Sequence, residues 1–422
     1  MSDKERTTFV KYYAGTSGSK LAHLRSEGES SAVLSVWIDG AGAAGEFLDD
    51  NIHTPGVAHL LEHICASRIA SIAEKNGWLF DASTNFSAVK YQVQSPKMDF
   101  EKASQCLFDA LSSPKKFLSK RATEIERAAN ELLRAKNLDP ARMFMDRTLH
   151  AIYNHPTFQY NNVGAEADIL SITNKDILRF WSSKYREGSF VIALSIDRAR
   201  EDLEHVFASP SMNKGKNADM SLVFRPTDIR WPTRRDGVLF QLAYPVSQPS
   251  NIEDYCKKQF IQHFMYIVID EEVRRRTRNY GIIRNWQGHT GYLRDSYNFV
   301  ARSHDAGKIL ERVCYSLERM ARTGTPAALR ARVKSEVNRP CNGVSSNLTF
   351  HQEILPQLSR YGAFVTDCEK VTFSKTVTKE DVKREAQNIL EGPLVFCAEG
   401  TLKGLPSRRQ VAGIFGRKSL SF

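Results

Sequence analysis

Hydrophobic and polar residues alternate along this chain with two periods, and each period predicts one kind of element. Apolar residues at every second position, or in short unbroken runs, are typical of strands, whereas apolar residues three and four apart are typical of helices. In the first half these patterns predict strands interleaved with helices, which indicates an α/β unit. The predicted strands cover 32–39, 83–93 and 190–196, and the predicted helices lie around 57–64 and at 99–113, 118–137, 140–153 and 173–184.

The second half repeats this order of elements without an obvious repeat of sequence. Its predicted strands are 238–245, segments within 281–303, and 393–399, and its predicted helices are 251–275, 305–322, 325–338, 346–360 and 378–390. The intervening segment is rich in Pro, Ser, Asn and charge, which is typical of a linker. The pattern therefore predicts an α+β protein with a first half at 1–208, a linker at 209–235 and a second half at 236–422.

The predicted helix near the start of the chain carries candidate chemistry, His59-Leu60-Leu61-Glu62-His63. Residues four apart lie on one helical face, so His59 and His63 can direct ring nitrogens at one metal ion, and Glu62 borders that face. The order H-x-x-E-H is the inverted zinc-peptidase motif. The alternative is an ordinary amphipathic helix, but the flanking residues are apolar, and buried histidines beside a glutamate are costly without a partner such as a metal.

A catalytic zinc site needs a third protein ligand and an open position. The segment 123–135, TEIERAANELLRA, predicts a helix of strong helix formers. Glu124 and Glu131 are two turns apart and face the same way, whereas Glu126 points elsewhere. A solvated charged face is the alternative reading of these two carboxylates.

Several segments resemble the N-terminal half of the M16 (insulinase/pitrilysin-type, LuxS/MPP-like) metallopeptidases, and among these the beta subunits of mitochondrial processing peptidases. The matching segments appear in the family's order over most of residues 30–210: HTPGVAHLLEHICA, DASTNFSAVKYQVQ, EIERAANELLRAKNLDP, MDRTLHAIYNHPTF and NVGAEADILSITNKDILRFWSSKYR. The resemblance implies two homologous α/β halves forming a clamshell. It also implies one Zn²⁺ per chain bound by His59, His63 and Glu131, with Glu124 supporting the ligands and Glu62 as the general base.

The implied activity is that of a zinc metalloendopeptidase acting on extended polypeptide. In such a site zinc polarises the scissile carbonyl and acidifies water, and a carboxylate moves the proton. The resemblance favours removal of N-terminal presequences in the mitochondrial matrix or a mitochondrion-related organelle, with a non-catalytic alpha-type partner subunit or none. The alternatives are a core structural subunit of the cytochrome bc1 complex and a general M16 oligopeptidase, the latter also compatible with the cytoplasm.

Three further residues are candidates for substrate binding. In the family an Arg and a Tyr from the second half reach toward the zinc, and Arg276 and Tyr280 have the four-residue spacing of one such pattern. A charged helix end is the alternative reading of this arginine-rich segment. Where relatives carry Asn-Ala-aromatic-Thr on an edge strand, this chain has Asp81-Ala82-Ser83-Thr84, and Asp81 is a candidate contact for a substrate Arg or backbone amide, or simply a turn former.

Charge is divided unevenly between the halves. The chain has a formal net charge of +11, yet residues 1–210 hold 25 Lys and Arg against 27 Asp and Glu, while residues 211–422 hold 34 against 21. A basic half is compatible with nucleic-acid binding, but the chain has no RNA-binding signature, phosphate loop or zinc finger. We therefore expect no nucleic-acid partner, and only the first half has the acidic balance that suits a basic presequence.

The remaining composition is that of an ordinary globular protein, with 41% apolar and 25% charged residues. No run of 18 apolar residues occurs, so no transmembrane segment is expected. The seven scattered cysteines predict free thiols rather than disulfides, and Cys65 is expected to face the core. The first residues, MSDKERTTFVKYY, match neither a secretory nor a typical transit signal, so mitochondrial targeting would need a short, internal or removed signal.

Overall fold

The computed structural model describes residues 10–14, 19–25, 29–47, 54–138, 140–153, 165–197, 223–234, 237–277, 282–284, 294–337 and 347–416. The chain divides into two compact units, each built on one β-sheet. Unit 1 comprises Met1–Arg142, Pro156–Met220 and Asn342–Phe364, and unit 2 comprises Met143–His155, Ser221–Cys341 and Val365–Phe422. The predicted α+β class, with one sheet in each half, is confirmed.

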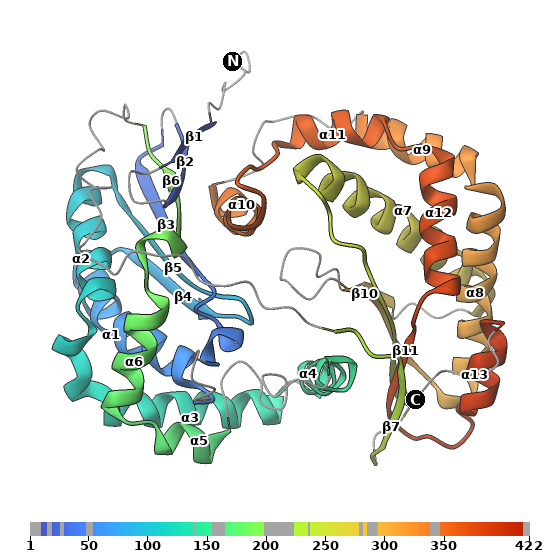
Figure 1. The fold of residues 1–422 in the computed structure, drawn as a ribbon, viewed down its shortest axis with the longest axis horizontal. Helices are drawn as coiled ribbons and strands as arrows, with labels where there is room; N and C mark the ends of the chain where they lie inside the picture. Colours follow the sequence, from blue (N-terminus) through green and yellow to red (C-terminus); the bar gives the residue numbers. More distant parts are fainter. Residues whose placement is uncertain are drawn as a thin grey trace. The chain divides into compact units, whose positions relative to one another are not determined.

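Six described strands form the sheet of unit 1, in the order β1-β2-β6-β3-β5-β4 (Figure 1). β2 pairs parallel with β6, and the other neighbours pair antiparallel. β3 and β6 are buried over nearly their whole length, as expected where both faces of a sheet are covered. The strands are β1 (Val10–Ala14), β2 (Lys20–Leu24), β3 (Ser31–Asp39), β4 (Leu79–Thr84), β5 (Ala88–Pro96) and β6 (Phe190–Ser195).

Helices cover one face of this sheet and enclose an apolar core (Figure 1). Alternate strand residues such as Leu34 and Tyr91 point into it, and helix residues such as Leu61, Leu107 and Ile177 meet them. The helical elements of unit 1 on this side are η1 (Ala43–Glu46), α1 (Val57–Asn76), η2 (Lys97–Asp99), α2 (Phe100–Ser112), η3 (Pro114–Lys120), α3 (Arg121–Leu138), α5 (Glu166–Ser171), α6 (Asn174–Lys184) and η5 (Glu187–Ser189).

The opposite face of the same sheet is covered by α10 (Asn347–Tyr361), which comes from far along the chain (Figure 1). Its apolar residues, among them Leu355 and Leu358, pack on β2, β3, β5 and β6. The Lys20 ammonium donates to the carbonyl oxygen of Leu358 at 2.8 Å, near the C-terminal end of α10. A buried hydrogen bond of 2.9 Å joins Ser195 Oγ on β6 to His351 Nε2 on α10. These contacts explain why 342–364 belongs to unit 1.

Unit 2 has a five-stranded sheet in the order β7-β11-β8-β10-β9. β7 pairs parallel with β11, and the other neighbours pair antiparallel. Its helices form a second apolar core against residues such as Phe240 and Phe299. The elements are β7 (Thr227–Pro232), β8 (Val238–Pro245), α7 (Ile252–Thr277), β9 (Ile282–Arg284), β10 (Arg294–Ala301), η7 (Ser303–Asp305), α8 (Ala306–Thr323), α9 (Pro326–Val337), α11 (Asp367–Lys375), α12 (Lys379–Glu391), β11 (Val395–Gly400) and α13 (Arg408–Ile414).

The other face of the second sheet receives α4 (Pro140–Tyr153). This contact is more polar than that of α10. The amide of Gln241 on β8 lies 3.3 Å from Met145 Sδ, and Arg147 forms a 2.9 Å ion pair with Glu399 on β11. Each sheet is thus covered on its second face by a helix from the other half of the sequence.

This exchange of helices differs from the contiguous halves predicted at 1–208 and 236–422. Residues 143–155 group with unit 2 and residues 342–364 with unit 1, because the helix in each segment, α4 or α10, packs on the sheet formed by the other half of the sequence. The described part of the predicted linker 209–235 contains strand β7, paired with β11. The remainder of that linker up to residue 222 lies outside the described residues.

The predicted single strand at 83–93 is wrong, because the structure has a β4–β5 hairpin there. Asn85 makes the turn: its Oδ1 accepts the backbone N–H groups of Ser87 and Ala88 at 2.8 and 2.9 Å. Asn favours such turns because its side chain can replace a backbone acceptor. Because of this hairpin, residues 79–84 form a separate strand, β4, which is the last of the described strands in the sheet.

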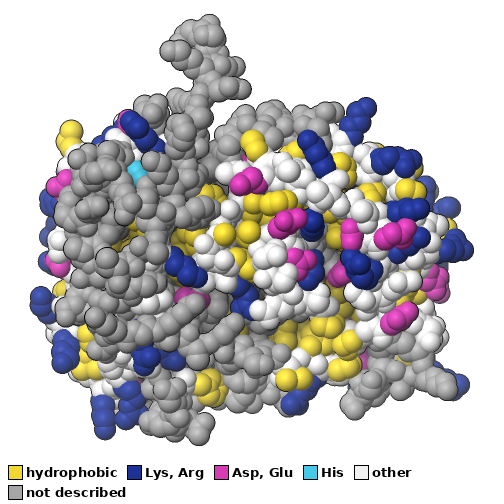
Figure 2. Space-filling model, turned by 45° about the horizontal axis from the view of Figure 1, so that its top comes forward, with side chains coloured by type: hydrophobic (Ala, Val, Ile, Leu, Met, Phe, Trp, Pro, Cys, Tyr) yellow, Lys and Arg dark blue, Asp and Glu magenta, His cyan; other side chains and the backbone are white. Residues whose placement is uncertain are grey.

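Many Lys and Arg side chains of unit 2 pair with carboxylates one helical turn away, such as Arg274 with Asp270 at 2.7 Å and Lys257 with Glu253 at 2.6 Å. On the face in Figure 2 the described Lys and Arg lie among Asp and Glu rather than in one continuous basic patch. Within the described part of the chain, no helix is both long and apolar enough to cross a bilayer. The six described cysteines are free, as predicted, and Cys341 lies outside the described residues.

The docking of α10 predicts a loss of stability in mild acid. Burial lowers the pKa of His351 to about 3, and the charge of Lys90 adds to this effect. In the unfolded chain a histidine has a pKa of about 6.5, so the unfolded state binds a proton first as the pH falls. Stability is therefore lost progressively between pH 6.5 and pH 3. From pH 7 to pH 5 we expect the free energy of unfolding to fall by about 2 kcal/mol through this residue, measured by urea titration.

The matched variants are His351→Gln and His304→Gln. The His304 side chain is 64% exposed, so its replacement should leave the pH dependence as in the wild type. In His351→Gln the fall in the free energy of unfolding from pH 7 to pH 5 should be about 2 kcal/mol smaller than in the wild type. An unchanged difference in His351→Gln would contradict this role of His351.

Candidate metal centre

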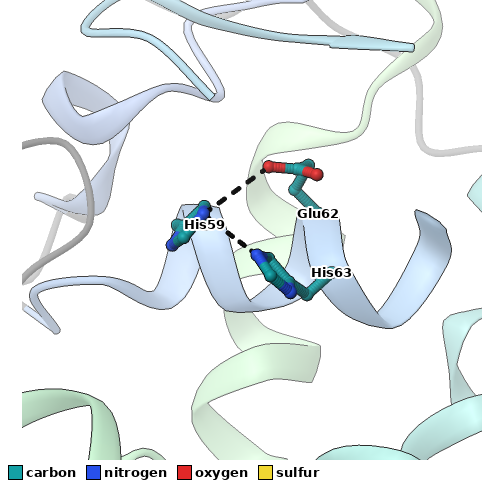
Figure 3. Close-up of side chains that lie close together, drawn as sticks. All are labelled: His59, Glu62 and His63. Atoms are coloured by element: carbon teal, nitrogen blue, oxygen red, sulfur yellow. Dashed lines mark hydrogen bonds and ion pairs between the residues drawn. The ribbon is translucent and has the colours of Figure 1, made fainter. Parts of the chain in front are cut away.

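The metal-binding candidates lie in the first two turns of α1, a helix fixed by its apolar residues. Leu60, Leu61 and Ile64 are fully buried in the core of unit 1. The three polar residues between them project from one side of the helix toward one another (Figure 3). His59 and Glu62 are buried, and the His63 side chain is 17% exposed. The sequence therefore uses apolar packing to hold a polar cluster in place.

The two imidazoles converge on a single point. Their rings pack edge to face at 84°, with His59 Nε2 and His63 Nε2 3.1 Å apart. Glu131 on α3 supplies a third atom: its Oε2 lies 3.3 Å from His63 Nε2 and 3.5 Å from His59 Nε2. The structure thus brings together all three residues expected to be ligands.

This triangle fits a tetrahedral metal ion. Zinc–nitrogen and zinc–oxygen bonds of about 2.0–2.2 Å give a tetrahedron with an edge of about 3.3–3.6 Å, close to the three observed separations. Without a cation, two ring nitrogens and a carboxylate oxygen would face one another, and one proton can bridge only two of them. A metal ion at the centre satisfies all three atoms at once. His59, His63 and Glu131 are therefore the residues that could hold a divalent metal.

Glu62 lies beside this triangle without being needed as a ligand. Its Oε2 is 3.9 Å from His59 Nε2 and accepts a 3.3 Å hydrogen bond from the Thr84 hydroxyl at the end of β4. Burial raises the pKa of Glu62, and the two histidines and Thr84 only partly offset this. A buried carboxylate with a raised pKa and a fixed orientation is suited to take up a proton.

Glu131 occupies a different environment from Glu62. Its side chain is 54% exposed, and hydrogen bonding to His59 and then to His63 lowers its pKa. A carboxylate that remains ionised is what a metal ligand requires. The two carboxylates at this site thus have opposite pKa shifts, which separates a ligand from a proton acceptor.

Glu124 approaches the other nitrogen of His63. Its Oε2 lies 3.6 Å from His63 Nδ1, and its Oε1 accepts a 3.0 Å bond from Arg127. Although burial lowers the pKa of His63, the bond to Glu131 and the charges of Glu62, Glu131 and Glu124 outweigh that effect and raise it. A carboxylate behind a ligating histidine orients the ring. Glu124 and Glu131 thus approach His63 from the same face of α3, as their two-turn spacing predicts.

The structure places the residues predicted to bind substrate as follows. The Asp81 carboxylate on β4 is 64% exposed and forms a 3.3 Å ion pair with the Lys90 ammonium. Arg276 ends α7 and pairs with Glu272 of its own helix at 3.5 Å. Tyr280 lies outside the described residues. The roles of these three residues remain predictions.

Two contacts of the site were missed from the sequence. Thr84 was read only as part of a strand motif, because its bond to Glu62 depends on the unpredicted hairpin. Glu46 lies 13 residues before His59, outside the H-x-x-E-H motif, so the motif does not predict its contact. Cys65 was correctly expected in the core: it is fully buried, and its thiol lies 3.6 Å from the carbonyl oxygen of Ala110.

Comparison with known proteins supports an insulinase-like relationship for the part of the chain that carries the cluster. Residues 20–165 match the model of Insulinase (Peptidase family M16). Zinc protease PqqE of Helicobacter pylori (strain ATCC 700392 / 26695) is 23% identical over 190 residues, which span 43% of this chain and only 42% of that protein.

Solved structures extend the likeness of fold to nearly the whole chain. A peptidase M16 inactive domain from Pseudomonas fluorescens aligns with a TM-score of 0.79 at 17% identity, over 94% of this chain and 100% of that one. A chain of Complex III2 from Candida albicans aligns with a TM-score of 0.81 at 12% identity, over 96% and 100%. At these identities the structures establish the fold alone. The family model thus covers residues 20–165, and over the rest of the chain the likeness is one of fold.

The geometry predicts that removal of the Glu131 charge weakens metal binding. In Glu131→Gln an amide replaces an ionised carboxylate, and we expect zinc affinity to fall by at least about 10-fold. Chelator competition measures this directly. Glu126→Gln is the matched control, because Glu126 is exposed on the same helix and should leave the affinity unchanged. Wild-type affinity in Glu131→Gln would exclude Glu131 as a ligand.

Proposed function

We propose that this chain is a zinc metalloendopeptidase of the M16 type that cleaves extended polypeptide. The observation that carries the proposal is the convergence of His59 Nε2, His63 Nε2 and Glu131 Oε2 to separations of 3.1–3.5 Å beside the buried Glu62. A zinc ion held there supplies a Lewis acid for the scissile carbonyl and a lowered pKa for water. The family match and the likeness to a zinc protease support the choice of metal.

Glu62 acts as the general base in this proposal. Its carboxylate takes a proton from the attacking water and returns it to the leaving nitrogen as the peptide C–N bond breaks. The raised pKa of Glu62 suits both halves of this transfer, since a strongly acidic carboxylate would hold the proton too briefly. The bond from Thr84 keeps one carboxylate oxygen turned toward β4.

The free edge of β4 is the proposed substrate-binding surface. Among the described strands β4 is the last of its sheet, and its outer backbone groups pair with no described strand, so they can pair with an extended segment. Thr84 ends this strand next to Glu62, so a peptide paired along β4 would pass the base. Backbone pairing requires an unfolded segment but little particular sequence, which suits a polypeptide substrate rather than a small molecule.

The finer proposal is that the substrate is an N-terminal presequence and that the enzyme works in the mitochondrial matrix or a related organelle. It rests on the sequence resemblance to beta subunits of processing peptidases and on the slightly acidic balance of residues 1–210. The ion pair of Asp81 with Lys90 argues against Asp81 as a dedicated arginine contact. A non-catalytic alpha-type partner, or action as a single chain, is part of the same proposal.

A core structural subunit is the second candidate, and the likeness to a Complex III2 chain favours it. The complete set of two histidines and two carboxylates argues for catalysis, because a structural subunit has no need of ligands at tetrahedral separations. A general oligopeptidase differs from the processing enzyme only in the number of bonds that it cleaves.

Replacement of the base predicts a separation of metal binding from catalysis. Glu62→Gln should bind zinc with wild-type stoichiometry and lose peptide cleavage by at least about 100-fold, because the amide cannot accept the proton. Zinc analysis and turnover of a fluorogenic peptide on one preparation measure both. Glu74→Gln, an exposed change on the same helix, should leave turnover unaltered. Full cleavage by Glu62→Gln would rule out its role.

Substrate mapping tests the function itself. Zinc-loaded protein is incubated with a synthetic presequence peptide, alone and with a chelator, and the fragments are identified by mass spectrometry. We expect chelator-sensitive cleavage at one bond. Cleavage at many bonds would support the general oligopeptidase, and a zinc-loaded protein that cleaves no peptide would support the structural subunit.

A further inference from the structure

The N-terminus of α1 lacks a cap of its own. The residue before the helix is Gly56, with φ of +85° and no capping side chain. The first N–H groups of a helix have no intrahelical acceptor and need one elsewhere. Here Glu46 Oε1 accepts the backbone N–H of Gly56 at 2.9 Å and that of Ala58 at 3.2 Å. Ala58 directly precedes His59, so this acceptor holds the turn that carries the first ligand.

Glu46 is itself fixed to the hairpin that ends in Thr84. It belongs to η1, where Ala43 N donates to Asn85 O at 3.1 Å and Ala44 N donates to Phe86 O at 2.8 Å. Gly42 lies so close to this turn that an added Cβ would sit 2.3 Å from Asn85 O. η1 is therefore pressed against the β4–β5 turn without room for adjustment.

These contacts connect the hairpin, η1 and α1 to one another around the site. The hairpin holds η1, η1 holds the start of α1 through Glu46, and Thr84 of the hairpin holds Glu62 one turn further along α1. We infer that Glu46 is a positioning residue that sets the metal-bearing turn of α1 against the edge strand β4. The inference rests on the proposed zinc centre and goes beyond it, because it assigns Glu46 a role toward the backbone of Gly56 and Ala58 rather than toward the metal.

An uncharged acceptor is sufficient for this role. Glu46 is only 4% exposed. Burial raises its pKa to about 8; the N–H groups of Ala58 and Gly56 oppose this rise, and the charge of Asp168 adds to it. A protonated Glu46 side chain keeps a carbonyl oxygen, so Oε1 accepts both N–H groups without a negative charge. A glutamine side chain has the same length and the same acceptor.

The experiment compares Glu46→Gln with Glu46→Met, which matches the length of the side chain but has no acceptor. Zinc affinity is measured by chelator competition at pH 7. We expect Glu46→Gln to remain within about twofold of the wild type and Glu46→Met to bind at least about 10-fold more weakly. The visible spectrum of the Co²⁺-loaded protein should shift in Glu46→Met and not in Glu46→Gln, because it reports ligand geometry.

Hydrogen exchange checks the local cause. Amides around Gly56 and Ala58 should exchange faster in Glu46→Met than in Glu46→Gln. Ile196→Ala, which opens a cavity in the same core directly after β6, is the control for general loss of stability and should keep zinc affinity at a comparable thermal midpoint. If Glu46→Met does not fold, Glu46→Asp, which withdraws the acceptor by one methylene, replaces it with the same expectation.

Wild-type affinity and spectrum in folded Glu46→Met would overturn the inference, and so would an equal loss in Glu46→Gln, since that loss would make charge the cause. None of these readouts uses a peptide. A protein that binds zinc but cleaves nothing would refute the proposed function while leaving the role of Glu46 intact.

Discussion

The site depends on one constraint: three ligand atoms from two helices must stay within 3.1–3.5 Å of one another on a largely buried surface. Such an arrangement is unfavourable by itself, because it gathers polar atoms that cannot all satisfy one another. Apolar residues on the remaining sides of α1 make it possible by anchoring the helix in the core of unit 1. The apolar packing of α1 thus offsets the unfavourable free energy of this polar cluster, which a bound metal ion would remove.

The different solvent exposures of Glu131 and Glu62 explain their different proposed roles. Glu131 sits half exposed against two imidazoles, so its ionised form is stabilised. Glu62 is buried on α1 between the two histidines, so burial raises its pKa and its neutral form becomes accessible. Two carboxylates whose pKa values are driven apart are a recurring basis for assigning different roles to chemically identical groups. The same burial makes Glu46 an uncharged cap.

The sequence predicted what local patterns encode. The apolar frame of α1 and the i, i+4 histidines indicate two ligands, whereas the spacing of Glu124 and Glu131 alone leaves a solvated charged face as an alternative. The resemblance to M16 peptidases added Glu131 as the third ligand, and the structure brings His59, His63 and Glu131 together. The β4–β5 hairpin was missed because its turn depends on Asn85, a single residue inside an apparently continuous strand pattern. Without the hairpin, neither the bond from Thr84 to Glu62 nor the contact of η1 could be inferred.

The sequence does not predict that α4 and α10 each pack on the sheet formed by the other half of the chain. Both helices were predicted, but their partners are sheet faces about 100 or more residues away, and periodicity carries no information about such pairing. Buried polar contacts such as His351 with Ser195 become visible only when the two faces are assembled. The basic excess of the second half remains without a structural explanation beyond its many ion pairs.

X-ray absorption spectroscopy of the zinc-loaded protein tests the metal centre most directly. The scattering pattern counts imidazole ligands and separates oxygen or nitrogen from sulfur. The account predicts one zinc per chain, with two imidazoles and oxygen ligands at about 2.0–2.2 Å and no sulfur. A sulfur ligand at about 2.3 Å, a single imidazole, or no bound zinc would contradict it.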